Sequence, residues 1–262
     1  MSDILLRSDA GAIATLTLNA PDRLNALSDA MLAALQAEID ALSEDRDIRV
    51  VILKGAGKVF CAGHDLKEMQ AGRQAEDKGR AYFADLFARC SRVMMGLMRL
   101  PQPVIAAPHG IATAAGCQLV ASCDLAIAAE GTRFGVNGVN IGLFCSTPMV
   151  ALSRNVPRKH AFEMLTTGAF IGTDKAASIG LINRAVPHDD LESETATLAE
   201  TLASKLNPAV RIGKRTFYEQ IAMEVEHAYA HAGNVMVENM LFRDTDEGIS
   251  AFLEKRKPDW QA

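Results

Sequence analysis

The sequence predicts an α/β protein with a mainly parallel sheet, and three observations support that prediction. Short apolar runs bounded by charged or turn residues fit buried strands at 49–54, 104–107 and 125–129. Apolar residues at helical spacing lie between these runs, and a strand–helix–strand order is typical of right-handed crossover units. After about residue 145 the pattern becomes helix only. We therefore expect an α/β core followed by a helical tail.

The first elements follow from turn and capping signals. Ile4–Arg7 and Ala12–Leu18 are apolar segments on either side of the polar Ser8–Gly11, which predicts a pair of strands. Ser28 is a typical N-cap, and the apolar residues that follow it at helical spacing predict a helix to about Ser43.

The later elements are mostly helices. Residues 62–78 are polar and predict a loop with a mobile helix, and a long helix over 81–100 is ended by two prolines. Small residues open a further helix at about 115–122. The tail predicts helices at 147–155, 158–166, 174–179, 189–206 and 209–230, and a last one from an Asp244/Glu247 capping box.

Composition excludes several classes of protein. Of the 262 residues, 49% are hydrophobic and 23% charged, which is typical of a globular protein. The net charge of −5 argues against nucleic acid as a partner, and no apolar run approaches the roughly 18 residues of a membrane span. The N-terminus has no signal-peptide pattern, and the odd set of five cysteines has no C-x-x-C pair. We therefore expect a cytoplasmic location.

Three segments could hold a site. Residues 58–69 have a glycine at a strand-to-loop transition before a charged loop, and 103–124 and 134–142 are rich in glycine or very small residues. Small side chains let a ligand approach the backbone, and a helix N-terminus offers free N–H groups. Two backbone donors aimed at one oxygen would form an oxyanion hole. The alternative is close packing of a helix on a sheet, which needs the same small residues.

These segments resemble the crotonase superfamily, the enoyl-CoA hydratase/isomerase family. One subgroup shares the strings GHDLKE at 63–68, AAGCQLVASCD at 114–124 and GLFCSTP at 142–148. The matching blocks, in chain order, are Leu24–Leu27, Phe60–Met69, Pro103–Ala107, Gly116–Cys117, Cys123–Asp124, Phe134–Gly135, Leu165–Gly168, Gly180–Ile182 and Ala251–Arg256.

The resemblance implies a fold and partners. It implies a crotonase-like ββα spiral core over residues 1–200 that binds acyl-CoA, and a C-terminal helical region over 201–262 for trimerisation and CoA contact. The expected ligand is an acyl-CoA thioester, with coenzyme A as part of the substrate and no permanently bound cofactor or metal. The expected assembly is a homotrimer or a dimer of trimers, without nucleic acid or membrane.

The resemblance also implies site residues. The backbone N–H groups of His64 and Ala115 match the two oxyanion donors, which polarise the thioester carbonyl and stabilise an enolate. Lys255 matches a C-terminal lysine that reaches the CoA phosphates, often those of a neighbouring subunit. The full set of expected CoA contacts is Arg23, Asp65, Leu66, Lys67, Phe252 and Lys255.

The sequence departs from the family at both catalytic glutamates. Hydratases of this family handle water with two carboxylates, but those positions hold Gln118 and Gly138. The side chain of His64 could replace a base, or His64 could contribute only its backbone. Cys145 could act as a nucleophile only if its pKa were lowered, and otherwise is a small buried residue.

We therefore expect an acyl-CoA-binding enzyme of this family whose ordinary hydratase activity is doubtful and whose reaction is open. A non-catalytic acyl-CoA-binding protein and a thioesterase-like enzyme are the alternatives. His227 and His231 have the i, i+4 spacing of a zinc pair, but a solvated helix face explains them equally and the family has no metal.

Overall fold

Six strands form the main sheet of the computed structural model, which describes residues 4–261. The first two strands are antiparallel, and every later neighbour in the sheet is parallel, as the crossover pattern predicts. The sheet order is β1 (Leu5–Ala10), β2 (Ile13–Leu18), β3 (Val50–Gly55), β4 (Val104–Ala107), β6 (Leu125–Ala129) and β8 (Arg184–Val186).

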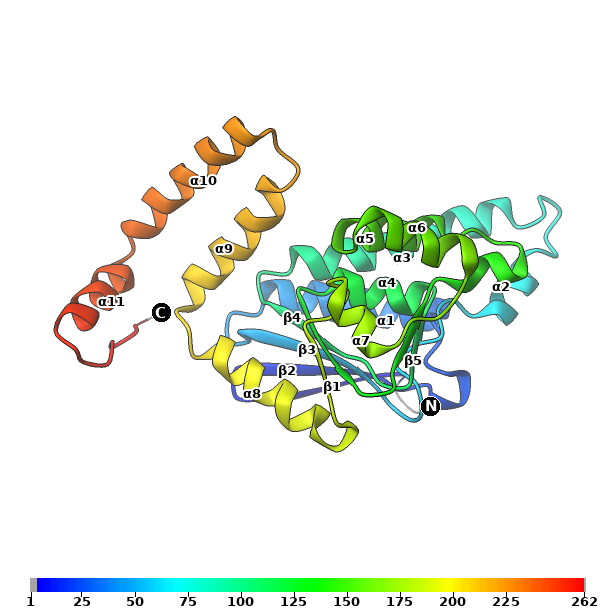
Figure 1. The fold of residues 1–262 in the computed structure, drawn as a ribbon, viewed down its shortest axis with the longest axis horizontal. Coiled ribbons are helices and arrows are strands. Elements are labelled where there is room, and N and C mark those ends of the chain that lie inside the picture. Colours follow the sequence, from blue (N-terminus) through cyan, green and yellow to red (C-terminus); the bar gives the residue numbers. More distant parts are fainter. Residues whose placement is uncertain (1–3, 262) are drawn as a thin grey trace.

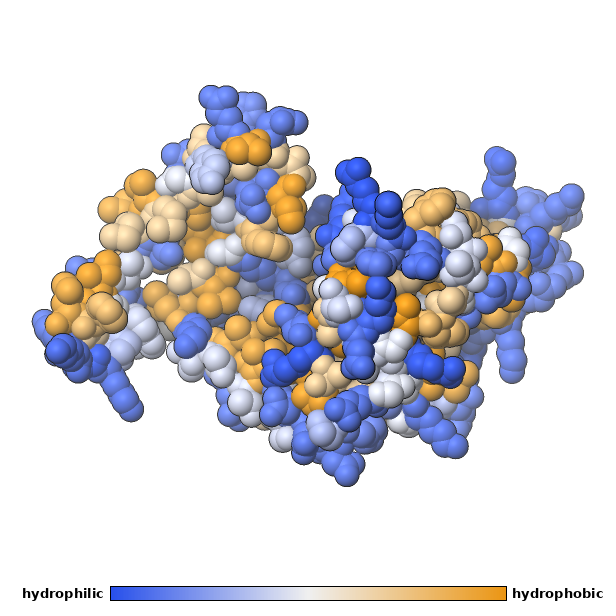
Figure 2. All heavy atoms as spheres, viewed as in Figure 1, coloured by the Kyte–Doolittle hydropathy of each residue, from blue (hydrophilic) through white to orange (hydrophobic). Residues whose placement is uncertain are grey.

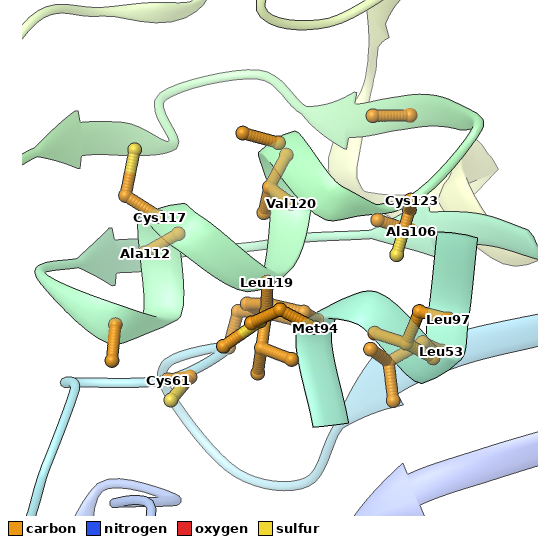
Figure 3. Packing of buried hydrophobic residues seen from close by; sticks show 14 of the residues in the cluster. Leu53, Cys61, Met94, Leu97, Ala106, Ala112, Cys117, Leu119, Val120 and Cys123 are labelled. Carbon is orange, nitrogen blue, oxygen red and sulfur yellow. The ribbon is translucent and has the colours of Figure 1, made fainter. Parts of the chain in front are cut away.

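The two faces of this sheet are covered by different helices (Figure 1). Val50 and Ile52 of β3 pack with α8, whereas the alternate residues Val51 and Leu53 join the main core. Helix α8 spans Leu191–Ala203, and the main core is built from α1 (Asp29–Glu44), α3 (Arg80–Arg99) and α4 (Ala115–Ser122). Figure 3 shows Leu119 of α4 and Met94 of α3 in that cluster. Both faces of the central strands β3, β4 and β6 are therefore buried, which explains their continuous apolar sequences.

A second sheet positions the candidate site. It pairs β5 (Ile111–Thr113) with β7 (Arg133–Gly135) in parallel. Cys61 adds to its edge, because its N–H donates to the Ile111 carbonyl at 3.1 Å and its carbonyl accepts from Thr113 at 3.0 Å. The loop after β3 is thereby held against the strand that leads into α4.

The last three helices form an arm that extends away from the core (Figure 1). These are α9 (Asn207–Gln220), α10 (Val225–Met240) and α11 (Arg243–Leu253). The remaining helices are α2 (Leu66–Gly72), α5 (Ser146–Asn155), α6 (Arg158–Thr167) and α7 (Thr173–Ser178), with short 3-10 turns at Pro21–Arg23, Asn137–Ile141 and His188–Asp190. Within residues 4–261 no helix is long and apolar enough to cross a membrane.

A buried ion pair fastens the arm to the core. Lys214 of α9 donates to the Asp124 carboxylate at 2.6 Å and to the carbonyls of Leu97 and Gln102 at 3.0 and 2.9 Å. Tyr218 donates to the other carboxylate oxygen of Asp124 at 2.8 Å. Burial lowers the pKa of Lys214 from its ordinary value even though Asp124 opposes that shift. Because the buried charges satisfy one another, removing either one would leave an uncompensated charge.

Several sequence predictions are wrong in detail. The strands β5, β7 and β8 were not predicted, and β8 interrupts a region that was expected to be helix only. The helix predicted over 209–230 is two helices, which fold back as α9 and α10. The Asp244/Glu247 capping box does not form, because the Glu247 carboxylate accepts from Arg256 and from the amide of Asp259. These contacts join residues that are separated in the sequence, so a local sequence pattern does not reveal them.

Candidate functional site

Gly63 brings the backbone at His64 against the start of α4. Gly63 has a φ of +91°, and a β-carbon there would lie 2.9 Å from the β-carbon of Ala114 and 3.3 Å from the amide nitrogen of Ala115. A β-carbon on Gly116 would lie 2.2 Å from the Cys61 carbonyl oxygen. Only glycine allows this approach, which explains why small residues were found in both segments.

The two amides predicted to be oxyanion donors are both free. Among residues 4–261, neither the His64 nor the Ala115 N–H donates a hydrogen bond to another protein group. Ala115 is the first residue of α4, so its amide has no partner within the helix. The residue before it, Ala114, has φ 50° and ψ −119°, a strained conformation that costs about 1–3 kcal/mol. The structure therefore places two unpaired donors on adjoining segments, beside a strained residue.

The imidazole of His64 is half-buried and uncharged. Its Nδ1 lies 3.3 Å from the Leu27 carbonyl oxygen, so Nδ1 carries the proton and Nε2 keeps its lone pair. Nε2 is buried without a partner, and the ring meets Phe87 edge-on with centroids 5.8 Å apart. Burial lowers the pKa of His64. The ring is therefore an acceptor at neutral pH rather than a cation.

Neither family glutamate position can ionise. Gln118 is buried on α4, and its Oε1 has no hydrogen-bond partner. Gly138 is buried in the turn over Asn137–Ile141, where a β-carbon would lie 2.6 Å from the Leu143 carbonyl oxygen and 2.8 Å from the Cys145 Sγ. The thiol of Cys145 therefore fills the space in which a side chain at 138 would begin.

The thiols in this region are protonated. Burial raises the pKa of Cys61 and Cys117 to about 12, and burial also raises the pKa of Cys145. A thiol with a raised pKa is a poor nucleophile at neutral pH. The structure therefore favours packing over chemistry for Cys145.

The expected CoA contacts near His64 are already part of a polar network. Asp65 caps α2 by accepting from the amides of Lys67 at 2.9 Å and Glu68 at 3.2 Å, and it is ion-paired with Arg23. Burial would raise the pKa of Asp65, but these bonds hold it below its ordinary value. Leu66 and Lys67 are exposed on the first turn of α2. These two side chains are free to meet a ligand, whereas Asp65 holds the loop in shape.

Phe252 and Lys255 lie far from the other candidates. They belong to α11 and the residues just after it, at the end of the arm away from α2 (Figure 1). Phe252 is 82% exposed. One chain therefore does not bring Lys255 to His64, and the expected phosphate contact requires the arm of a neighbouring chain.

The histidine pair on α10 has another explanation. His231 Nε2 lies 2.9 Å from the Glu219 carboxylate on α9, and His227 is exposed. Over the described part of the chain, no group of three or more metal-ligating side chains comes together. His231 thus links the two helices of the arm.

Two polar residues within the matching blocks have structural roles that sequence reasoning missed. Asn25 is completely buried, and its amide donates to the carbonyls of Ala56 and Val59, both at 2.8 Å. Asp124 anchors α9 as described above. A lone polar residue inside an apolar block was the available signal, since such groups are buried only when they are hydrogen-bonded.

Comparison with known proteins identifies relatives along almost the whole chain. A human protein named enoyl-CoA hydratase domain-containing protein 3, mitochondrial, is 48% identical over 95% of this chain and 80% of its own length. The expected cytoplasmic location is wrong, because five such relatives at 43–48% identity are named as mitochondrial, which points to the mitochondrion. An N-terminal pattern alone could not reveal this.

Solved structures and a family model agree on the family. The structure of an enoyl-CoA hydratase from Mycobacterium smegmatis is 53% identical, covers 99% of both chains and superposes with a TM-score of 0.95. That of human enoyl coenzyme A hydratase domain-containing protein 3 is 46% identical, covers 98% of this chain and all of its own, and has a TM-score of 0.93. A family model described as enoyl-CoA hydratase/isomerase matches residues 8–262. The resemblance and the predicted fold class are thus confirmed, and the chain belongs to the enoyl-CoA hydratase/isomerase family.

Proposed function

We propose that this protein is an acyl-CoA enzyme that holds the thioester oxygen between the amides of His64 and Ala115. The observation that supports the proposal is the pair of unpaired N–H donors on two segments that approach each other closely at Gly63 and Gly116. A preorganised donor pair stabilises charge that develops on an oxygen, and one such donor is typically worth about 2.7–4 kcal/mol in catalysis. The reaction class is therefore one that passes through a thioester enolate or a tetrahedral oxyanion.

Ordinary hydration of enoyl-CoA is not the reaction we propose. Water addition needs a base for the water and an acid for the α-carbon, and each such group contributes about 10²–10⁴-fold. Gln118 cannot exchange a proton near neutral pH and Gly138 has no side chain. We expect crotonyl-CoA hydration to be far slower than in a family member with both glutamates.

A non-catalytic acyl-CoA-binding role is the second candidate. It is favoured by the absence of a carboxylate at positions 118 and 138. Turnover separates the two candidates: mass spectrometry of the protein with a panel of acyl-CoA and enoyl-CoA esters would detect a product for an enzyme and none for a binding protein.

We also propose that the arm assembles the chain into a trimer or a dimer of trimers. Apolar side chains gather on the surface of the arm (Figure 2). Tyr229 of α10 is 78% exposed and Phe252 of α11 is 82% exposed. Exposed apolar patches of this kind are typical of interaction surfaces. A cleft of about 1190 Å³ between α9 and the end of α3 has room for part of a neighbour. In such an assembly Lys255 reaches the site of the adjacent chain.

The oxyanion site is tested by adding volume beside one donor. Ala115→Val places two extra methyl groups at the start of α4, where Ala115 is buried against the Gly63 segment. We expect it to weaken acyl-CoA binding and any turnover at least tenfold. Ala121→Val adds the same volume at a buried position near the other end of α4 and is the matched control.

Circular dichroism would first establish that both variants fold. Unchanged affinity and turnover in folded Ala115→Val protein, or an equal loss in the Ala121→Val control, would contradict the proposed site.

A further inference from the structure

The last helix of the arm ends in a lysine whose backbone conformation is typical of glycine. Helix α11 closes in a Schellman turn: the amide of Lys255 donates to the Phe252 carbonyl at 3.2 Å, and the amide of Arg256 donates to the Ala251 carbonyl at 3.0 Å. Lys255 has a φ of +57°, at the position of this turn that glycine usually occupies because a β-carbon is unfavourable there. A lysine therefore makes the turn less stable than a glycine would.

Nothing within one chain explains why this position holds a lysine. The side chain of Lys255 is exposed, and over residues 4–261 its ammonium has no hydrogen-bond or ion-pair partner. It lies at the end of the arm, away from the core (Figure 1). Strained backbone conformations persist where the surrounding structure fixes them, and they are concentrated at functional sites. The strain at Lys255 therefore indicates that the cation has a partner outside its own chain.

The C-terminal residues are clipped to α11 and fix the chain that follows this turn. The two carboxylate oxygens of Glu247 accept from the Arg256 guanidinium at 2.6 and 3.0 Å, and one of them accepts from the amide of Asp259 at 2.8 Å. Trp260 packs on the same helix, because a β-carbon on Gly248 would lie 2.9 Å from its ring. Arg256 lowers the pKa of Glu247 to about 2, so the clip stays charged at neutral pH.

We propose that Glu247 and Arg256 are positioning residues that hold Lys255 at the phosphates of an acyl-CoA ester bound in the neighbouring chain. The inference rests on the proposed function, because it requires both the acyl-CoA ligand and an assembly that brings the arm to an adjacent site. A lysine suits a phosphate, since its compact charge attracts the anion without a fixed bonding geometry. A backbone that is already fixed reduces the conformational freedom that the lysine loses on binding.

This proposal predicts an effect opposite in sign to that of charge alone. Removing the Glu247 carboxylate takes a negative charge away from a phosphate site, so electrostatics alone would strengthen the binding of an acyl-CoA ester. A positioning role predicts the reverse, because the loss of Glu247 releases Arg256 and the turn before it. Asp246 is the matched control, since it is exposed on the same helix and, among the described residues, its carboxylate has no hydrogen-bond or ion-pair partner. Asp246→Asn therefore changes the charge without opening the clip.

The test compares butyryl-CoA with butyryl-pantetheine, which share the acyl group and the thioester. Their affinities are measured by calorimetry for the wild type, Lys255→Gly, Glu247→Gln and Asp246→Asn. Lys255→Gly should weaken butyryl-CoA about tenfold, the size of one charge-assisted hydrogen bond, and leave butyryl-pantetheine unchanged. Glu247→Gln should weaken butyryl-CoA about threefold, again with no effect on the pantetheine ester. Asp246→Asn should bind butyryl-CoA at least as tightly as the wild type does.

Hydrogen exchange separates positioning from a loss of folding. In the ligand-free protein, the amides of residues 254–261 should exchange about fivefold more slowly in Lys255→Gly, because glycine relieves the strain of the turn. The same amides should exchange faster in Glu247→Gln, because the clip is open. Weaker binding of butyryl-CoA by Lys255→Gly, whose turn is better formed than that of the wild type, then reports the lost cation and not unfolding.

Three results would overturn the proposal while the oxyanion site stood. These are a Glu247→Gln protein that binds butyryl-CoA as tightly as the wild type, a Lys255→Gly protein that keeps the wild-type ratio of the two affinities, and a Lys255→Gly protein that no longer assembles in sedimentation. The last would mean that the lysine pairs with a carboxylate of the neighbouring chain and not with a phosphate. Failure of the wild type to bind either ester would overturn the proposed function and this inference together.

Discussion

Replacing Gln118 by methionine should make the ligand-free protein more stable. Methionine has nearly the length and volume of glutamine, so the exchange leaves no large cavity. It removes a buried amide oxygen, Oε1, that has no partner, and such an unpaired group costs about 1–3 kcal/mol. The free energy of unfolding should therefore rise by about 1–3 kcal/mol. For a chain of this size that corresponds to a rise in Tm of roughly 2–4 °C per kcal/mol.

Gln102 provides the matched control for this exchange. Both side chains are buried and both have an Oε1 without a partner, but the Nε2 of Gln102 donates to two carbonyl oxygens. Gln102→Met also removes an unpartnered oxygen, but it loses both hydrogen bonds at about 1 kcal/mol each, so its free energy of unfolding should lie about 2 kcal/mol below that of Gln118→Met. The same chemical change at two buried glutamines should thus differ in its effect on stability by about 2 kcal/mol.

Urea denaturation of the two variants and the wild type, followed by circular dichroism, gives the required free energies. The samples must contain no acyl-CoA, because a bound ligand would stabilise the wild type by mass action. The reasoning is refuted if Gln118→Met destabilises the protein as much as Gln102→Met does. That result would mean that Gln118 Oε1 is bonded in solution, for instance through an ordered water. A stable variant with impaired binding would instead show that the site is maintained at a cost in stability.

Three further changes test other parts of the structure. Because the pKa of His64 is lowered in the folded state, the unfolded chain binds more protons below about pH 6.5, and the stability that neutral His64 contributes is lost as pH falls. His64→Gln should reduce the slope of the free energy of unfolding against pH by up to about 1.4 kcal/mol per pH unit between about pH 7 and 5. The exposed control His227→Gln should leave that slope unchanged. Urea midpoints across that range measure it, and parallel curves for wild type and His64→Gln would contradict it. Lys255→Ala should weaken CoA esters several-fold in binding assays but spare pantetheine esters, which lack the nucleotide phosphates; equal weakening of both would make the lysine a solvated surface residue. Gly138→Ala should lower the free energy of unfolding by about 1–3 kcal/mol, because its β-carbon would lie 2.6 Å from a carbonyl oxygen. An unchanged Tm in thermal unfolding would contradict this, because it would mean that the turn can shift to accommodate the β-carbon without loss of stability.

The clash at position 138 also decides how a hydratase site could be restored. Gln118→Glu adds a carboxylate of the same shape, whereas Gly138→Glu must displace the Leu143 carbonyl and the Cys145 thiol. Any gain in crotonyl-CoA hydration should therefore need both glutamates and a smaller residue at 145. Groups that act as a unit are strongly non-additive, so the single changes should give little.

The sequence by itself determined the elements whose signals are local. The helix capped by Ser28 and the buried strand before Gly55 were predicted almost to the residue, because periodicity and capping act over a few neighbours. The spaced motif blocks identified the family and the two oxyanion positions. They also showed that one glutamine and one glycine stand where carboxylates are expected, since that is a property of residue identity alone.

Only the tertiary structure decided what these residues meet. The free amides of His64 and Ala115 lie on different elements, and their approach depends on Cys61 joining the second sheet and on space left by glycines. Strand β8 was missed because three residues carry too little periodicity to be distinguished from a loop, and pairing with β6 stabilises it. The unsatisfied amide oxygen of Gln118 could not be predicted for the same reason: whether a side chain lacks a hydrogen bond depends on every neighbour that folding brings to it, and the chain order does not specify those neighbours.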